Sequence, residues 1–203
     1  MAPEGDRGSP GRSAASGNAA PAAGCAARAS DRSDGGARLT DARGSAPVRH
    51  LILRTDGAAR GNPGPAAAGA LLEDADAPPG RRPLATISEA LGVTTNNVAE
   101  YVALLLALEA AEGLGAREVE LRLDSQLIVE QLGGGYRVRD PKLQPLFREA
   151  RERLAHFERW TVRHVPRAEN AAADALANEA LDHGRRPDER VRRWLPSGMF
   201  DRM

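Results

Sequence analysis

Four acidic residues are placed so that their carboxylates could share one site: Asp56, Glu100, Asp124 and Asp174. Two follow apolar runs that are typical of buried strands, and two lie within segments of helical periodicity. Carboxylates that share a pocket repel one another unless they are protonated or paired with cations. Hard divalent ions such as Mg²⁺ bind oxygen ligands and keep several waters. Two such ions about 4 Å apart can activate water and stabilise the leaving oxygen of a phosphodiester.

The elements that must position these acids can be predicted from periodicity and turn residues. Strands are expected at 49–56, 66–73, 84–91, 117–124 and 158–165, and helices at 97–113, 126–132, 141–157 and 171–181. Ser125 and Asn170 are expected to cap the helices that follow them. This order predicts an α/β fold: an antiparallel meander followed by parallel strands, forming a five-stranded mixed sheet flanked by helices. The four acids would meet at the carboxyl ends of its central strands, where such sheets bind ligands.

Composition divides the chain into three parts. Residues 1–46 are rich in Ala, Gly, Ser and Arg and contain too few large apolar side chains to fold, so a disordered tail is expected. Residues 47–183 carry the predicted elements and form one domain. Residues 184–203 form an Arg-rich C-terminal tail, which is expected to be loosely docked or disordered.

Overall charge and cysteine content restrict the classes of protein that fit. The formal net charge is +0, so any nucleic-acid contact must come from a local patch. Cys25 is the only cysteine, which leaves no intramolecular disulfide and favours a reducing compartment, the cytoplasm. No apolar run approaches the roughly 18 residues of a membrane span, and the N-terminus lacks the apolar core of a secretory signal.

Four motifs surround the acids in a fixed order. They are Asp56-Gly57 with Gly61-Asn62-Pro63-Gly64-Pro65, then TTNNVAEY, then DSQLIV, then HVPRAENAAADALAN. One of these motifs alone would be weak, but the four in register resemble type 1 ribonuclease H over about residues 48–183. The resemblance implies a monomeric endonuclease that cuts the RNA strand of RNA–DNA hybrids with two Mg²⁺ ions, for which Mn²⁺ can substitute. The expected product ends are 5′-phosphate and 3′-hydroxyl.

The same resemblance implies a role for individual residues. The four acids would be the metal ligands. Polar side chains and backbone would line the minor groove of the hybrid or hold a DNA phosphate, reading 2′-hydroxyls that only RNA carries; these are Gly57, Asn62, Thr95, Asn96, Asn97 and Gln126. His164, ten residues before Asp174, would assist proton transfer or product release, unless it is held in the strand.

Simpler interpretations stand beside these roles. Glu100 would suit the start of a helix, Asp124 a turn after a strand, and Asp174 a solvated helical position. Asn96 and Asn97 would suit an N-cap. A non-cleaving module that binds hybrid or double-stranded RNA is the alternative function, and an integrase or resolvase of similar fold is a third.

The chain also departs from part of the family. Some members insert a basic helix and loop between the second helix and the next, whereas here Gly133-Gly134-Gly135-Tyr136 runs quickly into Pro141. The sequence therefore predicts a short form without this protrusion, for which lower hybrid affinity and a broader substrate range are expected. The resemblance to related short forms, which can tolerate double-stranded RNA, implies double-stranded RNA as a further partner.

Overall fold

The computed structural model describes residues 50–184 and 186–195. The predicted tail at 1–46 and the last residues, 196–203, lie outside this described part. Five strands form one sheet in the order β3-β2-β1-β4-β5. Their bounds are β1 His50–Ala59, β2 Gly64–Asp74, β3 Ala85–Thr94, β4 Glu118–Leu123 and β5 Arg159–His164.

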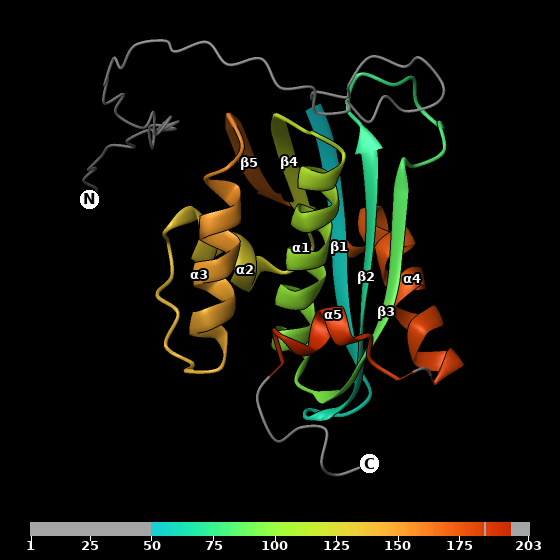
Figure 1. The fold of residues 1–203 in the computed structure, drawn as a ribbon, viewed down its shortest axis with the longest axis vertical. Coiled ribbons are helices and arrows are strands. Elements are labelled where there is room, and N and C mark those ends of the chain that lie inside the picture. Colours follow the sequence, from blue (N-terminus) through green and yellow to red (C-terminus); the bar gives the residue numbers. More distant parts are fainter. Residues whose placement is uncertain (1–49, 185, 196–203) are drawn as a thin grey trace, which may run out of the picture. The chain divides into compact units, whose positions relative to one another are not determined.

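The sheet is mixed, as predicted (Figure 1). Strands β1, β2 and β3 form an antiparallel meander, and β4 and β5 continue the sheet parallel to β1. Glycine allows α4 to pack closely against this sheet, because a Cβ on Gly69 of β2 would lie 2.2 Å from the carbonyl oxygen of Ala173.

Strand β1 is longer than the prediction that ended it at Asp56. Its parallel pairing with β4 stops at Thr55, which faces Leu123, but its antiparallel pairing with β2 continues to Ala59. Asp56 therefore lies inside a strand, one residue beyond the point where β4 turns away. At this position β4 no longer pairs with the backbone of β1, while β2 still does.

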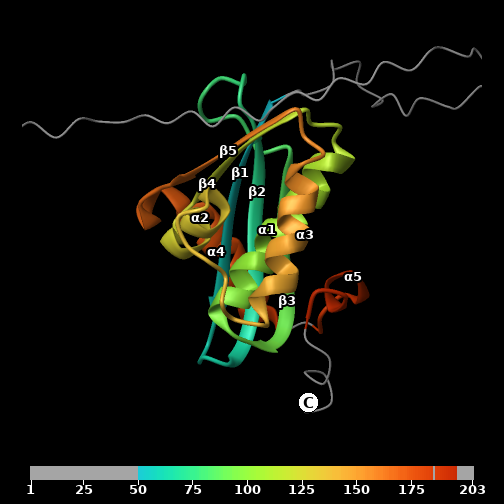
Figure 2. The same cartoon turned by 90° about the vertical axis from the view of Figure 1, so that its left-hand side faces the viewer.

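Helices cover both faces of the sheet. Their bounds are α1 Asn96–Gly113, α2 Gln126–Gly133, α3 Leu143–Leu154, α4 Ala171–His183 and α5 Glu189–Arg192, with a 3₁₀ turn η1 at Arg167–Asn170. Helix α1 packs between the sheet and α3, which explains why apolar residues surround it. Helix α4 packs on the opposite face (Figure 2). No helix in the described ranges, 50–184 and 186–195, is long and apolar enough to span a membrane.

The expectation of a loose or disordered segment at 184–203 is wrong for its part around α5. Val191, Trp194 and Leu195 are buried in the main hydrophobic core. The ring of Trp194 also receives the guanidinium groups of Arg153 and Arg193, whose central carbons lie 5.8 and 4.2 Å from its centroid. Three apolar side chains at helical spacing thus hold a segment whose composition is otherwise polar.

Candidate active site

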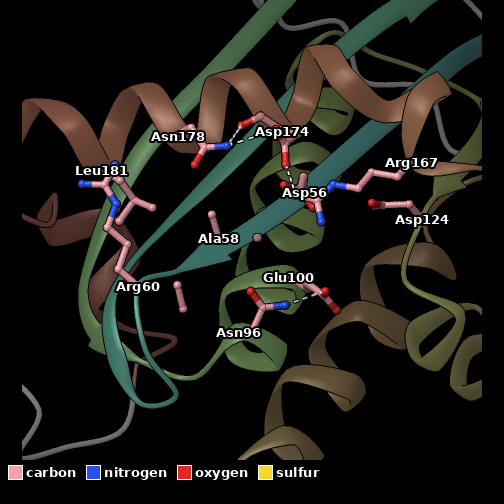
Figure 3. A pocket seen from close by; sticks show the side chains of 12 residues that line it. Asp56, Ala58, Arg60, Asn96, Glu100, Asp124, Arg167, Asp174, Asn178 and Leu181 are labelled. Atoms are coloured by element: carbon pink, nitrogen blue, oxygen red, sulfur yellow. Dashed lines mark hydrogen bonds and ion pairs between the residues drawn. The ribbon is translucent and has the colours of Figure 1, made fainter.

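The four predicted acids line a single cleft of about 500 Å³. Asp56 comes from β1, Glu100 from α1, Asp174 from α4, and Asp124 from the residue after β4. Figure 3 shows Asp174 pointing in from α4 and Glu100 from α1, with Asp56 between them. Strand, helix and loop thus converge as the motifs predicted.

Asp56 is the most constrained of the four carboxylates. It is only 9% exposed. Burial is the main reason that the pKa of its carboxyl is raised from 3.8 to about 7, and the negative charges of the other three acids add to this shift. The cation of Arg167 acts in the opposite direction. The cleft therefore concentrates more negative charge than its own residues neutralise.

Glu100 is held by two hydrogen bonds within the cleft. The Ser125 hydroxyl donates to its Oε2 at 2.6 Å, and the Asn96 side-chain amide donates to its Oε1 at 2.8 Å. Burial raises the pKa of Glu100, while the hydrogen bond from Ser125 opposes this effect. The expectation that Ser125 caps α2 is wrong, because its hydroxyl bonds to this carboxylate instead.

Asp124 is positioned by Asn170, a residue whose role the sequence did not predict. The Asn170 side-chain amide donates to Asp124 Oδ1 at 2.8 Å and to the Thr55 carbonyl at 2.9 Å. It is fully buried and joins β1, the end of β4 and the start of α4. The prediction that Asn170 caps α4 with its side chain is therefore wrong. The feature of the sequence that could have indicated a role for Asn170 in the site is its place in the HVPRAEN motif, four residues before Asp174.

Asp174 has two partners of its own. Arg167 donates to Asp174 Oδ1 at 2.5 Å, and the Asn178 amide donates to Asp174 Oδ2 at 3.0 Å. Arg167 lines the cleft, which no sequence pattern predicted, and Arg60 lines it as well. Arg54 instead pairs with Glu73 at 3.0 Å.

Arg60 is engaged as well, in an ion pair with Asp182. His164 is exposed, and its Nε2 lies 3.2 Å from the backbone carbonyl oxygen of Asp124. A proton on Nε2 would be donated to this oxygen. His164 is thus attached to the backbone beside the cleft rather than to a carboxylate of the site.

The predicted nucleic-acid contacts lie around the N-terminus of α1. The Asn62 side-chain oxygen accepts from the Asn96 backbone N–H at 3.3 Å, which ties the β1–β2 turn to the helix. Thr95 caps α1 by accepting from the Val98 N–H at 3.4 Å, so capping explains this residue at least in part. The side chain of Asn97 is exposed.

Two further predicted contacts differ in character. Gln126 is exposed at the start of α2. Gly57 lines the cleft, but its lack of a side chain has a packing reason. A Cβ at this position would lie 2.1 Å from the backbone nitrogen of Glu100, so only glycine lets β1 and α1 approach this closely.

The donor set fits a hard divalent cation in its chemistry. Within the described residues, no three acidic, histidine or cysteine side chains form a ready-made metal-binding group. Each of the three carboxylates around Asp56 is instead turned toward a protein donor. All four acids offer oxygen, the ligand atom that Mg²⁺ prefers. Their mutual repulsion at Asp56 is the force that such a cation would relieve.

Comparisons with known proteins agree with this geometry. A family model described as reverse transcriptase-like matches residues 54–180. Ribonuclease HI of Halobacterium salinarum is 51% identical over 127 residues, which cover 63% of this chain and 62% of that protein. A bifunctional protein of Mycobacterium tuberculosis is 43% identical over 132 residues, covering 65% of this chain and 35% of that protein.

A solved structure extends the comparison to a bound nucleic acid. A ribonuclease H1 isolated from compost, in complex with an RNA/DNA hybrid, superposes with a TM-score of 0.60. It is 41% identical, and the match covers 66% of this chain and 98% of that one.

Proposed function

Because this chain belongs to the type 1 ribonuclease H family, we propose that it cuts the RNA strand of RNA–DNA hybrids. The observation that carries this proposal is the convergence of four acids on one cleft, with the pKa of Asp56 raised to about 7. The relative that was crystallised with an RNA/DNA hybrid supports the choice of substrate. The chain spans 62% of the Halobacterium relative and 35% of the Mycobacterium one. The proposed activity is therefore argued from the acidic cleft of this chain and not from the activity of those whole proteins.

We further propose that the four acids hold two Mg²⁺ ions, for which Mn²⁺ can substitute. Ions bound there would activate the attacking water and stabilise the leaving oxygen, giving 5′-phosphate and 3′-hydroxyl ends. The fold of the chain positions the carboxylates that would hold these ions. The backbone of Asp56 is fixed by β2, and Asn170 sets the orientation of Asp124. Asp174 accepts from Arg167 at Oδ1 and from Asn178 at Oδ2, and each oxygen keeps a further lone pair with which it could hold an ion.

Selection for RNA is proposed to come from the polar residues around the N-terminus of α1 and the start of α2. Asn97 and Gln126 are exposed, so their amides are available to 2′-hydroxyls and base edges of a hybrid. Asn62 and Asn96 are already joined to each other, which fixes this rim of the cleft before a substrate arrives. Activity on double-stranded RNA, a monomeric state and a cytoplasmic location stay predictions.

The test is cleavage of a blunt RNA–DNA hybrid in Mg²⁺ by the wild type and by Asp124→Asn. Asp76→Asn is the matched control, because this acid is exposed in the β2–β3 loop. We expect cleavage by the wild type and the control. A loss of about 100-fold or more is expected for Asp124→Asn, since electrostatic stabilisation at metal sites contributes several kcal/mol. A fully active Asp124→Asn, or a wild type that binds the hybrid without cutting it, would contradict the proposal; the second result would indicate a binding module.

A further inference from the structure

A second hollow, of about 870 Å³, lies where the chain passes from α2 to α3. Its walls combine aromatic, aliphatic and cationic side chains, which are Tyr136, Arg137, Val138, Arg139, Phe147 and Arg148. We call it the α2–α3 hollow. It is separate from the acidic cleft, with which it shares no lining residue among those described.

The arginines of the α2–α3 hollow differ from most others in the protein. Elsewhere guanidinium groups are paired: Arg122 donates to Glu120 at 2.8 Å, and Arg153 bridges two glutamates. Arg137, Arg139 and Arg148 are exposed, and within residues 50–184 and 186–195 their guanidinium groups have no ion-pair partner. In a chain of formal net charge +0, three cations gathered around one hollow form a local site for anions.

Tyr136 gives this hollow an exposed aromatic surface. It is 53% exposed, the highest value among the large hydrophobic side chains that are described. Its backbone is held in place, because the Tyr136 N–H donates to the Glu130 carbonyl at 3.0 Å. Phe147 and Val138 pack against the core beside it, and the Gln144 amide donates to the Val138 carbonyl at 3.3 Å. An exposed tyrosine ring beside unpaired arginines suits a nucleotide, whose base is flat and whose phosphate is anionic.

We propose that the α2–α3 hollow binds unpaired nucleotides of the single strand that continues from a hybrid held in the acidic cleft. A base would stack on Tyr136, and its flanking phosphates would contact Arg137 and Arg139. Paired bases within a duplex have both faces covered by their neighbours, so only an unpaired base can use a tyrosine face in this way. This inference rests on the proposed function, because the cleft must hold the hybrid from which the strand continues.

The placement of the hollow relative to the cleft supports this connection. Helix α2 begins directly after Asp124 and Ser125 and ends at Gly133, just before the hollow. Its eight residues span about 12 Å at 1.5 Å per residue. A strand that leaves the cleft therefore has only the length of one short helix to cross before it reaches Tyr136.

The experiment measures binding by fluorescence anisotropy in Mg²⁺, with Asp124→Asn as the non-cutting background. The probes are a blunt hybrid, the same hybrid with a single-stranded DNA extension at either end, and the single strand alone. The variants are Tyr136→Leu and the double change Arg137→Gln/Arg139→Gln. The matched control is Arg81→Gln/Arg82→Gln, which removes the same charge from the exposed β2–β3 loop.

We expect an extension to tighten binding and Tyr136→Leu to remove about 5- to 150-fold of that gain, the range for one base stacked on an aromatic side chain. Binding of the extension is described by the slope of the logarithm of the binding constant against the logarithm of the salt concentration. The double arginine variant should reduce the size of this slope by about 0.7 for each phosphate that an arginine no longer neutralises. Tyr136→Leu should leave that slope unchanged, because the tyrosine carries no charge. The control should behave as the unmodified background does.

Three results would overturn the inference. The extension could give no gain, Tyr136→Leu could keep the whole gain, or the arginine variant could weaken blunt and extended hybrids equally, which would indicate duplex phosphates instead. Cleavage of the blunt hybrid, measured with the same changes in the wild-type background, separates this inference from the proposed function. If the wild type cuts the blunt hybrid, the proposed function stands even when the extension adds nothing.

Discussion

Replacing Asp56 with asparagine is expected to stabilise the metal-free protein above neutral pH, although it removes a residue central to the proposed activity. The pKa of Asp56 in the folded protein is about 7, against an ordinary value of 3.8. The folded state therefore binds more protons than the unfolded state between these values, so this group makes stability fall as pH rises through that interval. Above it, Asp56 is ionised in both states and its whole cost to the fold is present.

The size of the effect follows from the same values. The difference between 3.8 and about 7 corresponds to roughly 4 kcal/mol as an upper limit, at about 1.4 kcal/mol per pKa unit. Solvent in the open cleft screens these charges, and we expect about 1–2 kcal/mol in practice. Asparagine keeps the shape of the side chain without its charge. At about pH 8 in EDTA the variant should be more stable by this amount, and the difference should disappear near pH 4.

The assay is urea unfolding followed by circular dichroism at several pH values, with and without Mg²⁺. Asp76→Asn is the control for the loss of an exposed carboxylate. Mg²⁺ should stabilise the wild type by about 2.7 kcal/mol at a concentration 100 times its Kd, and should stabilise Asp56→Asn much less. The reasoning is refuted if Asp56→Asn is less stable than the wild type in EDTA at pH 8, or if the difference persists unchanged at acid pH.

Three further predictions concern residues around the cleft. Asn170→Ala leaves the Asp124 carboxylate and a strand carbonyl without their donor; unfolding should show a loss of about 1–3 kcal/mol, and kinetics should show a larger fall in kcat than rise in KM. Gly57→Ala should destabilise the fold by about 3 kcal/mol or more, because its Cβ would meet the α1 backbone at 2.1 Å. Gly133 has open space around it, so Gly133→Ala should be tolerated, and thermal melts of the two glycine variants measure this difference. His164→Ala should slow cleavage less than Asp124→Asn does, because its ring reaches a backbone carbonyl rather than a carboxylate, and equal losses would contradict this placement.

The sequence was sufficient to predict that the four acids converge and that the sheet is mixed, because both depend on order and periodicity along the chain. Strand ends and helix positions repeat a fixed pattern, and the sheet topology then brings Asp56 and Asp124 to one edge. The same pattern located the start of α1, where Asn96 contacts Glu100 at a spacing of four residues. Residues four positions apart on a helix are neighbours on its surface, so local spacing is enough to predict contacts of this kind.

The predictions that were wrong concern contacts between residues far apart in the sequence. Ser125 and Asn170 both precede helices, so N-capping was the local prediction. In the fold their side chains bond to acids that lie 25 and 46 residues away. The position of Gly57 inside β1 likewise depends on β2 continuing beyond the end of β4. Composition suggested a loose C-terminal segment because arginines outnumber the few apolar residues that hold α5 in place.

The most direct test of the proposed activity uses a blunt hybrid whose RNA and DNA strands carry different end labels, incubated with the wild type in Mg²⁺. We predict that the RNA strand is cut to fragments with 5′-phosphate and 3′-hydroxyl ends, that the DNA strand stays intact, and that EDTA abolishes cutting. Cleavage of the DNA strand, or an intact RNA strand under conditions where the hybrid is bound, would contradict the proposal that this acidic cleft is a ribonuclease H site.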